Sequence, residues 1–179
     1  MAVLKIRTFG DPVLRQSARS IAKITETHRR LAADMIDTMR AAPGVGLAGP
    51  QVGVLERIFV WEVDDDFGVV INPLVTARSA ETEVDEEGCL SLPGVLQPVE
   101  RSLRATIEGV DDNGVPVLLE ADDLLARVCQ HEIDHLDGVL LIDRIPDEQR
   151  KEALRTLREL ALGLTPVTAV PRPPREDAL

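Results

Sequence analysis

The segment His131-Glu132-Ile133-Asp134-His135 constrains this chain more than any other part of its sequence. Two histidines four residues apart lie on one face of a helix, about one turn from each other, so both imidazoles can bind one cation. Glu132 follows the first histidine and can reach a water on that cation as a general base. The pattern predicts a helix that carries part of a catalytic metal site. A surface helix with two solvated histidines is the simpler alternative.

A catalytic zinc-type site needs a third protein ligand and one open position. The remaining histidine, His28, follows the start of an expected helix and precedes two arginines, a pattern typical of a solvated face. We therefore do not expect His28 to bind the metal. Carboxylates and cysteines remain as candidates.

The two cysteines differ in their relation to the expected metal helix. Cys129 lies two residues before His131, about 200° around a helix, so its sulfur is expected to point away and pack as a small buried hydrophobe. Cys89 lies in a Gly- and Pro-bounded segment whose backbone can approach a site closely. Elimination favours Cys89 as the third ligand. Two imidazoles, one thiolate and an open position indicate hydrolysis at a Lewis-acidic metal.

Hydrophobic periodicity predicts an α+β fold, with mainly antiparallel β-sheets packed around the central metal-binding helix and with an N-terminal and a C-terminal helix. The expected helices cover residues 26–39, 122–136 and 147–162. The expected strands cover residues 57–63, 69–71, 103–110 and 115–119. Asp111-Asp112-Asn113-Gly114 predicts a hairpin turn between the last two strands. We expect one catalytic domain over 1–164 and an extended or disordered Pro-rich tail over 165–179.

Composition argues against several classes of partner. The net charge of −11 repels a phosphate backbone, and an aromatic content of 2% leaves few platforms for base stacking. We expect no direct nucleic-acid substrate. No run approaches the roughly 18 apolar residues of a membrane-spanning helix, and the first residues lack the apolar core of a secretory signal. We therefore expect no membrane partner, a cytoplasmic location and unpaired thiols.

Three segments together resemble the signature motifs of the peptide deformylase family. They are Gly44-Val45-Gly46-Leu47-Ala48-Gly49-Pro50-Gln51, Glu87-Gly88-Cys89-Leu90-Ser91 and Gln130-His131-Glu132-Ile133-Asp134-His135-Leu136, in the family's order and at its spacing. The resemblance covers residue 1 to about residue 160 and includes Phe9-Gly10-Asp11-Pro12-Val13-Leu14-Arg15 and Asp143-Arg144. The tail falls outside it.

The resemblance implies a hydrolase that removes the formyl group from the N-terminal formylmethionine of newly made polypeptides and releases formate. Cys89, His131 and His135 are implied to hold one divalent metal ion, Fe(II), with Zn(II) as the alternative. Glu132 is the implied catalytic acid and base.

The resemblance also implies how the substrate is held. The side chain of Gln51 and the backbone N–H of Leu90 are the implied donors to the oxyanion, and Pro50 restrains the backbone before Gln51. Gly44, Val45 and Gly46 resemble an edge to which the peptide adds as a strand, where small residues leave room for another backbone.

Two further residues complete the expected substrate site. Gly88, in the second motif, is expected beside the bound peptide. Val128 lies three residues before His131 on the metal-facing side of the helix. Its side chain is expected to line a pocket for the methionine side chain, with core packing as an equal alternative.

One position departs from the family pattern, which usually has alanine where this chain has Gly49. We expect the glycine to loosen the loop that carries Gln51 and to lower efficiency at most. The acidic cluster over residues 81–87 is expected to be mainly solvated. Glu87 is the exception, with Arg101 as a plausible partner.

The last helix carries basic residues opposite an apolar stripe. The resemblance implies transient contact between this region and the ribosome, where substrates emerge. An amphipathic helix docked on the core is the favoured interpretation, and the net charge of −11 weighs against tight ribosome binding.

Two other functions remain open at this point. A metallopeptidase that cuts internal peptide bonds would usually take a histidine or a carboxylate as its third ligand. A non-catalytic, metal-stabilised binding module would close its site with four protein ligands, and only three good ones are found.

Overall fold

The computed structural model describes residues 2–164. The predicted tail, 165–179, lies outside the described residues. The helices are α1 (Glu26–Ala41), α2 (Asp123–Leu136) and α3 (Asp147–Ala161), with short 3-10 turns η1 (Pro12–Arg15), η2 (Gly49–Val52) and η3 (Leu141–Asp143). The strands are β1 (Gly46–Ala48), β2 (Ile58–Val63), β3 (Asp66–Arg78), β4 (Thr82–Gly88), β5 (Leu96–Ser102), β6 (Arg104–Val110) and β7 (Pro116–Asp122).

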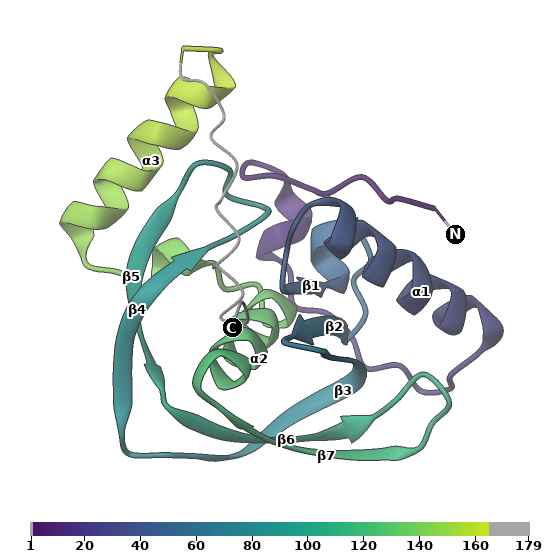
Figure 1. The fold of residues 1–179 in the computed structure, drawn as a ribbon. Helices are drawn as coiled ribbons and strands as arrows, with labels where there is room; N and C mark the ends of the chain where they lie inside the picture. Colours follow the sequence, from purple (N-terminus) through teal and green to yellow (C-terminus); the bar gives the residue numbers. More distant parts are fainter. Residues whose placement is uncertain (1, 165–179) are drawn as a thin grey trace, which may run out of the picture.

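The strands form two antiparallel sheets around α2. One sheet has the order β1-β2-β3-β6-β7, and the other pairs β4 with β5. In Figure 1, α2 lies in the middle of the molecule, with β4 and β5 on one side and β1 and β2 on the other. The predicted α+β architecture is confirmed.

Strands β1, β4 and β5 and the second half of β3 were not expected from the sequence. Strand β4 carries acidic side chains on both faces, so it lacks the alternation of apolar and polar residues that indicates a half-buried strand. Strand β3 was expected to end before Asn72-Pro73 but continues to Arg78. A register shift between Ile71 and Leu74 accommodates the proline, which cannot donate a ladder hydrogen bond.

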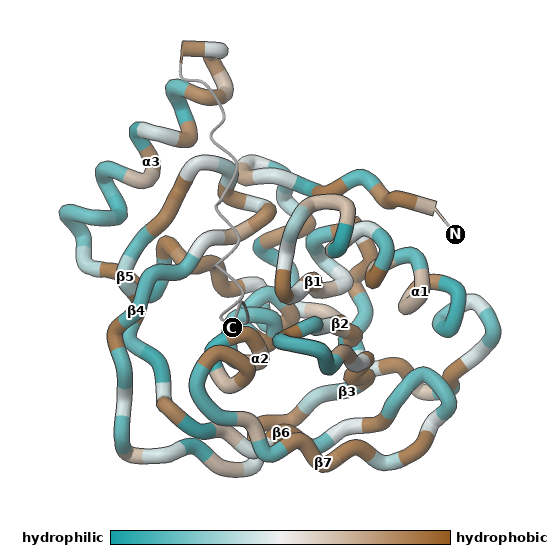
Figure 2. Tube along the Cα trace, viewed as in Figure 1, coloured by the Kyte–Doolittle hydropathy of each residue, from teal (hydrophilic) through white to brown (hydrophobic). Residues whose placement is uncertain are grey.

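The core consists of three clusters of buried side chains, contributed by α2 and by the elements that surround it. Val128, Cys129, Ile133 and Leu136 of α2 pack in one cluster with Phe59. Ala153 and Leu157 of α3 pack in a second cluster with Cys89. Hydrophobic and hydrophilic residues alternate along α1 and α3 in Figure 2, as in helices that cover a core with one face. The docked interpretation of the last helix therefore fits its packing.

The first helix corrects the expectation for His28. Its Nδ1 accepts the Thr25 N–H at 2.9 Å, and its Nε2 lies 3.3 Å from a carboxylate oxygen of Glu56. The imidazole is a partly buried helix cap, not a side chain on a solvated face. Among the described residues, His28 does not belong to the cysteine–histidine group described below.

Within residues 2–164, no helix has the length and apolar character needed to cross a membrane.

Asp143 links the two ends of the described chain. Its carboxylate pairs with Arg15, lies 3.4 Å from Arg150 of α3, and accepts the Leu140 N–H at 2.9 Å. Partial burial raises the pKa of Asp143, but the hydrogen bonds from Arg15 and Leu140 outweigh this effect and hold the pKa below its ordinary value. The ionised carboxylate therefore stabilises the fold.

Replacing Asp143 with asparagine is expected to lower the free energy of unfolding at pH 7 by about 1 kcal/mol, because a charge is removed from partly exposed ion pairs. The folded-state pKa lies below the unfolded one, so this contribution is present above about pH 4 and is lost as the pH falls further. Urea denaturation of both proteins across this range measures the difference. A difference that grows toward acid pH would contradict the assignment.

Candidate active site

The structure brings Cys89, His131 and His135 into one buried group. Their potential ligand atoms all lie within 4.8 Å of one another, and the Cys89 Sγ is 3.2 Å from the His135 Nε2. The two histidines come from successive turns of α2, and Cys89 comes directly after β4. This group therefore depends on the packing of the two-stranded sheet against α2.

Cys129 lies apart from this group, as its position on α2 predicts. It is fully buried in a core cluster with Phe59 and Ile133. Burial, together with the negative charge of Glu132, raises the pKa of the Cys129 thiol to about 12. A thiol this hard to ionise is a poor metal ligand and a poor nucleophile, because the thiolate is the reactive form.

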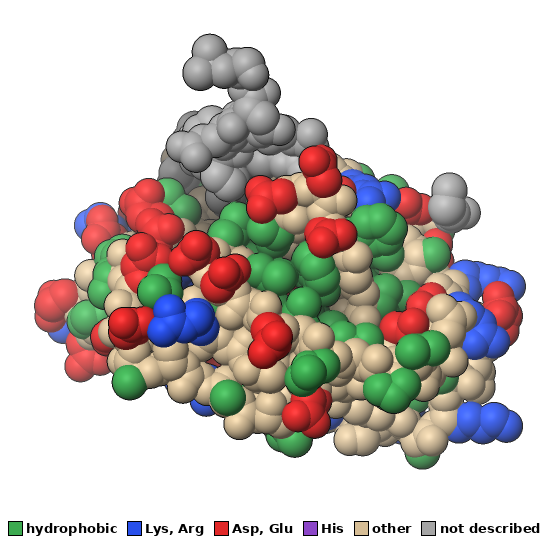
Figure 3. Space-filling view, turned by 60° about the horizontal axis from the view of Figure 1, so that its bottom comes forward, with side chains coloured by type: hydrophobic (Ala, Val, Ile, Leu, Met, Phe, Trp, Pro, Cys, Tyr) green, Lys and Arg blue, Asp and Glu red, His purple; other side chains and the backbone are tan. Residues whose placement is uncertain are grey.

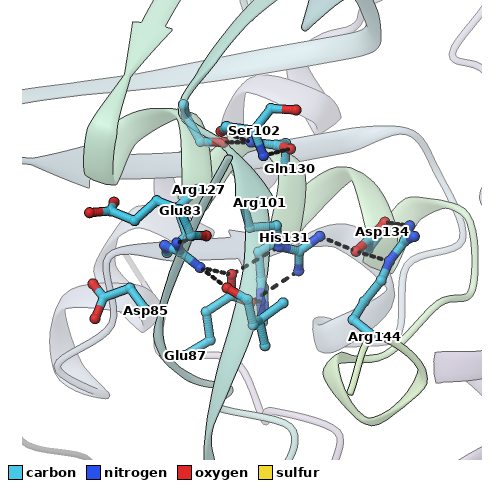
Figure 4. Close-up of polar contacts among 12 residues, drawn as sticks. Glu83, Asp85, Glu87, Arg101, Ser102, Arg127, Gln130, His131, Asp134 and Arg144 are labelled. Atoms are coloured by element: carbon cyan, nitrogen blue, oxygen red, sulfur yellow. Dashed lines mark hydrogen bonds and ion pairs between the residues drawn. The ribbon is translucent and has the colours of Figure 1, made fainter. Parts of the chain in front are cut away.

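Glu87 is the central carboxylate of a buried ionic network beside the group. One oxygen lies 3.0 Å from the His131 Nδ1, and Arg101 binds both oxygens, at 2.9 and 3.0 Å. Arg127 of α2 adds a third donor at 2.9 Å (Figure 4). Because Nδ1 is held by Glu87, the other ring nitrogen of His131 is left to face the cysteine. The expected Glu87–Arg101 pair is present.

Asp134 extends this network along α2. Arg101 donates to it at 2.6 Å, and the Arg144 Nε donates at 3.0 Å from the segment after η3 (Figure 4). Sequence reasoning missed Arg127, Asp134 and Arg144 as supports of the site. The available signal was Arg127 on the expected metal helix, because a charge on a buried helix needs a partner.

The pKa values of the two histidines are shifted in opposite directions. Burial alone would lower the pKa of His131, but hydrogen bonds with Cys89 and Glu87 hold it well above its ordinary value. Burial lowers the pKa of His135 well below its ordinary value, and the charges of His131 and Arg101 act in the same direction. Burial raises the pKa of Glu87, yet its bonds with His131 and Arg101 hold that pKa far below the usual range.

Glu132 has a different environment from Glu87. It is 4% exposed, and its Oε2 has no hydrogen-bond partner in the part of the chain that the structure describes. Burial raises the pKa of this carboxyl to about 7, with the charges of Glu87 and Asp134 adding to the effect. A side chain in this state can both accept and donate a proton near neutral pH.

Gly46 is the glycine on which the position of Glu132 depends. A Cβ at residue 46 would lie 2.9 Å from the Glu132 Cδ and 2.9 Å from the Val128 Cγ1. At residue 44 a Cβ would meet the Leu90 Cδ1 at 2.8 Å. The small residues of the first motif therefore make room for this chain's own side chains, in addition to any room they leave for a peptide.

Gln51 is held so that its amino group faces the cysteine. Its Oε1 accepts the Ala48 N–H at 2.7 Å, and its Nε2 lies 3.8 Å from the Cys89 Sγ. The expectation that Gly49 loosens this loop is not supported by the packing. A Cβ at residue 49 would lie 2.8 Å from the carbonyl oxygens of Val54 and Glu56, so the glycine permits a close contact of two backbone segments.

Leu90 lies at the second position of a turn in which Leu92 N–H donates to Cys89 O at 2.9 Å. The N–H at this position of a turn is not used by the turn itself. Among residues 2–164 it has no hydrogen-bond acceptor, so it is free to bind an anionic oxygen.

The expected substrate residues lie on both sides of α2. Val45 precedes β1 and is partly buried, and Gly88 ends β4 opposite Leu96. Val128 is 4% exposed and belongs to a core cluster. β1 is the outer strand of its sheet, and Val45 O accepts the Glu62 N–H from β2. In an antiparallel ladder, successive residues of a strand point their backbone groups alternately toward and away from the partner strand. Because Val45 bonds to β2, the N–H and C=O of Gly46 face the open edge.

The donor set fits a single divalent transition-metal ion. One thiolate and two imidazoles are ligands that zinc and ferrous iron share, and three ligands leave a coordination position open. The buried carboxylate of Glu132 and the amide of Gln51 lie beside this group. A buried Cys/His/His group next to a buried carboxyl whose pKa is about 7, on an α+β scaffold, fits a hydrolase.

The chain belongs to the polypeptide deformylase family, whose model, described as Polypeptide deformylase, matches residues 3–151. It is 50% identical over 181 residues to the peptide deformylase of Acidothermus cellulolyticus, with 100% of each chain covered. It is 46% identical over 171 residues to that of Parafrankia sp., covering 95% of this chain and 93% of the relative. Homologues are peptide deformylases, amidohydrolases that act on formyl-methionyl peptides.

Solved structures agree with this assignment. The crystal structure of a peptide deformylase from Legionella pneumophila matches with a TM-score of 0.86 at 35% identity, covering 92% of this chain and 100% of that one. The peptide deformylase from Thermus thermophilus matches with a TM-score of 0.83 at 43% identity, covering 90% of this chain and 97% of that one. The chain is an amidohydrolase that removes the N-formyl group from nascent peptides.

Cys89→Ala is expected to lower bound metal at least tenfold, because it removes one of the three candidate ligand atoms of the group. Cys129→Ala is the matched control and is expected to keep the metal, since its sulfur lies in the core. Elemental analysis after anaerobic purification measures both. Equal loss of metal from the two variants would contradict the ligand assignment.

Glu87→Ala is expected to lower the free energy of unfolding by about 3–5 kcal/mol, because it leaves Arg101 and Arg127 buried without their carboxylate. Glu86→Ala, the exposed neighbour on the same strand, is expected to change it by less than about 0.5 kcal/mol. Urea denaturation compares the two. Similar effects would show that the network does not hold β4 against α2.

Proposed function

We propose that Cys89, His131 and His135 hold one divalent metal ion, and that deformylation takes place beside it with Glu132 as acid and base. The observation that carries this proposal is the convergence of the three ligand candidates with a carboxyl whose pKa is about 7. When bound, the ion supplies Lewis acidity to the formyl group and makes water more acidic. Ferrous iron is the proposed ion, with zinc as the less active alternative.

Glu132 handles the protons of the reaction in this proposal. Its carboxylate accepts a proton as water adds to the formyl carbon, and it returns that proton to the departing nitrogen as the C–N bond breaks. Formate and a free N-terminal amine are the products. The unpartnered Oε2 of Glu132 suits this task, because no other described side chain competes for it.

Gln51 and Leu90 stabilise the negative oxygen that forms on the formyl group. The amide oxygen of Gln51 is occupied by Ala48 N–H, so its amino group is fixed as the donor that faces Cys89. The Leu90 N–H comes from the adjacent turn. Two donors that are already in place need no reorganisation as charge develops.

The peptide is proposed to add to the open edge of β1, where the N–H and C=O of Gly46 offer one donor and one acceptor. Val45 and Val128 supply apolar contacts for the methionine side chain, and Gly88 borders the peptide from the β4 side. On the face shown in Figure 3, apolar side chains gather in a hollow surrounded by acidic ones. Such a surface suits an uncharged formylated N terminus better than a polyanion.

We further propose that the protein acts in the cytoplasm, where nascent chains emerge, and that contact with the ribosome is transient. Lys151 of α3 pairs with Glu148 at 2.7 Å and Arg155 lies 4.0 Å from Glu159, so acidic partners offset part of the positive charge of this helix. Its main role in this proposal is to cover the core.

Glu132→Ala is expected to lower the rate of formate release from formyl-Met-Ala-Ser by about 10²–10⁴-fold while the metal content stays unchanged. Glu152→Ala, on the exposed face of α3, is the control and should match the wild type. Unchanged turnover in Glu132→Ala would rule out its role. Cleavage of internal bonds without formate release would favour a metallopeptidase instead.

A further inference from the structure

The two donors proposed for the oxyanion come from separate parts of the fold. Gln51 lies in η2, which follows β1 of the five-stranded sheet, and Leu90 lies in the turn that follows β4 of the two-stranded sheet. Among the described residues, no backbone hydrogen bond joins residues 49–52 directly to residues 89–92. Gln51 Nε2 approaches Cys89 Sγ at 3.8 Å, and the Glu87 network holds β4 against α2. A segment that bonds to both loops would fix their spacing more directly.

The N-terminal segment bridges these two loops. Arg7 N–H donates to Gln51 O at 2.7 Å, and Phe9 N–H donates to Ser91 O at 2.8 Å. In Figure 1 the purple N-terminal trace crosses over the molecule from the side of α1 toward the tip that joins β4 and β5. We name residues 7–9 the N-terminal strap.

Both acceptors of the strap are buried and adjoin the proposed donors. Gln51 and Ser91 are 1% and 0% exposed, so their carbonyls depend on protein donors for hydrogen bonds. The Arg7 side chain also lies over the end of η2, because a Cβ at Gly53 would lie 3.0 Å from the Arg7 Nε.

We propose that the N-terminal strap is a positioning element for deformylation, which holds the Leu90 turn at the correct distance from Gln51. The inference rests on the proposed function, because it requires Gln51 and the Leu90 N–H to stabilise the oxyanion. Misplacement of a prearranged donor weakens binding of the transition state more than binding of the peptide. Loss of the strap bond should therefore appear in kcat and leave KM almost unchanged.

The local geometry allows one strap bond to be removed without straining the backbone. Asp11 N–H donates to Thr8 O at 3.1 Å, and Gly10 has a φ of +101°, which together describe a turn with Phe9 at its second position and a glycine at its third. Proline is favoured at the second position of such turns. Phe9→Pro thus removes the N–H that binds Ser91 and keeps the turn.

Phe9→Ala is the matched reference, because it removes the same side chain and keeps the N–H. We expect the kcat of Phe9→Pro for formyl-Met-Ala-Ser to be about tenfold below that of Phe9→Ala, with KM values within about twofold of each other. Amide hydrogen exchange should be faster in residues 89–95 of Phe9→Pro, with residues 58–63 unchanged. Equal kcat values, or equal exchange in residues 89–95, would overturn the proposal.

Hydrogen exchange of the wild-type protein provides a test that does not depend on the folding of a variant. The Arg7 and Phe9 amides should be protected as strongly as the amide of Leu92, whereas exchange at the rate of an unstructured chain would overturn the proposal. The proposed function is tested separately. If the metal-loaded wild type releases no formate, that function fails, whereas wild-type activity with no difference between the two Phe9 variants refutes only the strap.

Discussion

The site depends on the burial of a single carboxylate, Glu87, among three positively charged or proton-bearing partners. The Glu87 side chain is only 4% exposed, and removing a carboxylate from water is very costly unless both of its oxygens are paired. Arg101, Arg127 and His131 provide these partners. Its partners lie on β5 and α2, while Glu87 lies on β4. The pairing therefore fixes the two-stranded sheet against the helix. Cys89, two residues after Glu87, is brought to the histidines by the same contacts.

This arrangement gives two buried carboxylates of one site different tasks. Glu87 is surrounded by cations, which keep it ionised as a support for His131. Glu132 has no such partner, and burial raises its pKa to about 7. The contrast follows from position, because Glu87 points into the network and Glu132 packs against the backbone of Gly46. One carboxylate thus orients a metal-ligand candidate, and the other is suited to proton transfer.

The sequence predicted the parts of the molecule that are determined by residues close together in the chain. The spacing of His131 and His135 identified α2, and the helical angle separated Cys129 from the group. β4 was missed because its buried residue is a glutamate, and burial of Glu87 depends on arginines distant in sequence. His28 was misjudged because its partner, Glu56, is reached only in the folded chain. The packing of Gly49 against Val54 and Glu56 depends on contacts with residues outside its motif, and so does the N-terminal strap. The sequence of a motif alone does not reveal such contacts.

The absence of a side chain at Gly46 also limits how this enzyme can diverge. The same backbone unit is the proposed docking edge for the peptide and the surface on which Glu132 and Val128 rest. A larger residue there would alter recognition and proton transfer together, so selection cannot adjust one without the other at this position. A change of sequence preference is therefore expected to arise at neighbouring positions, such as the partly buried Val45, and not at residue 46.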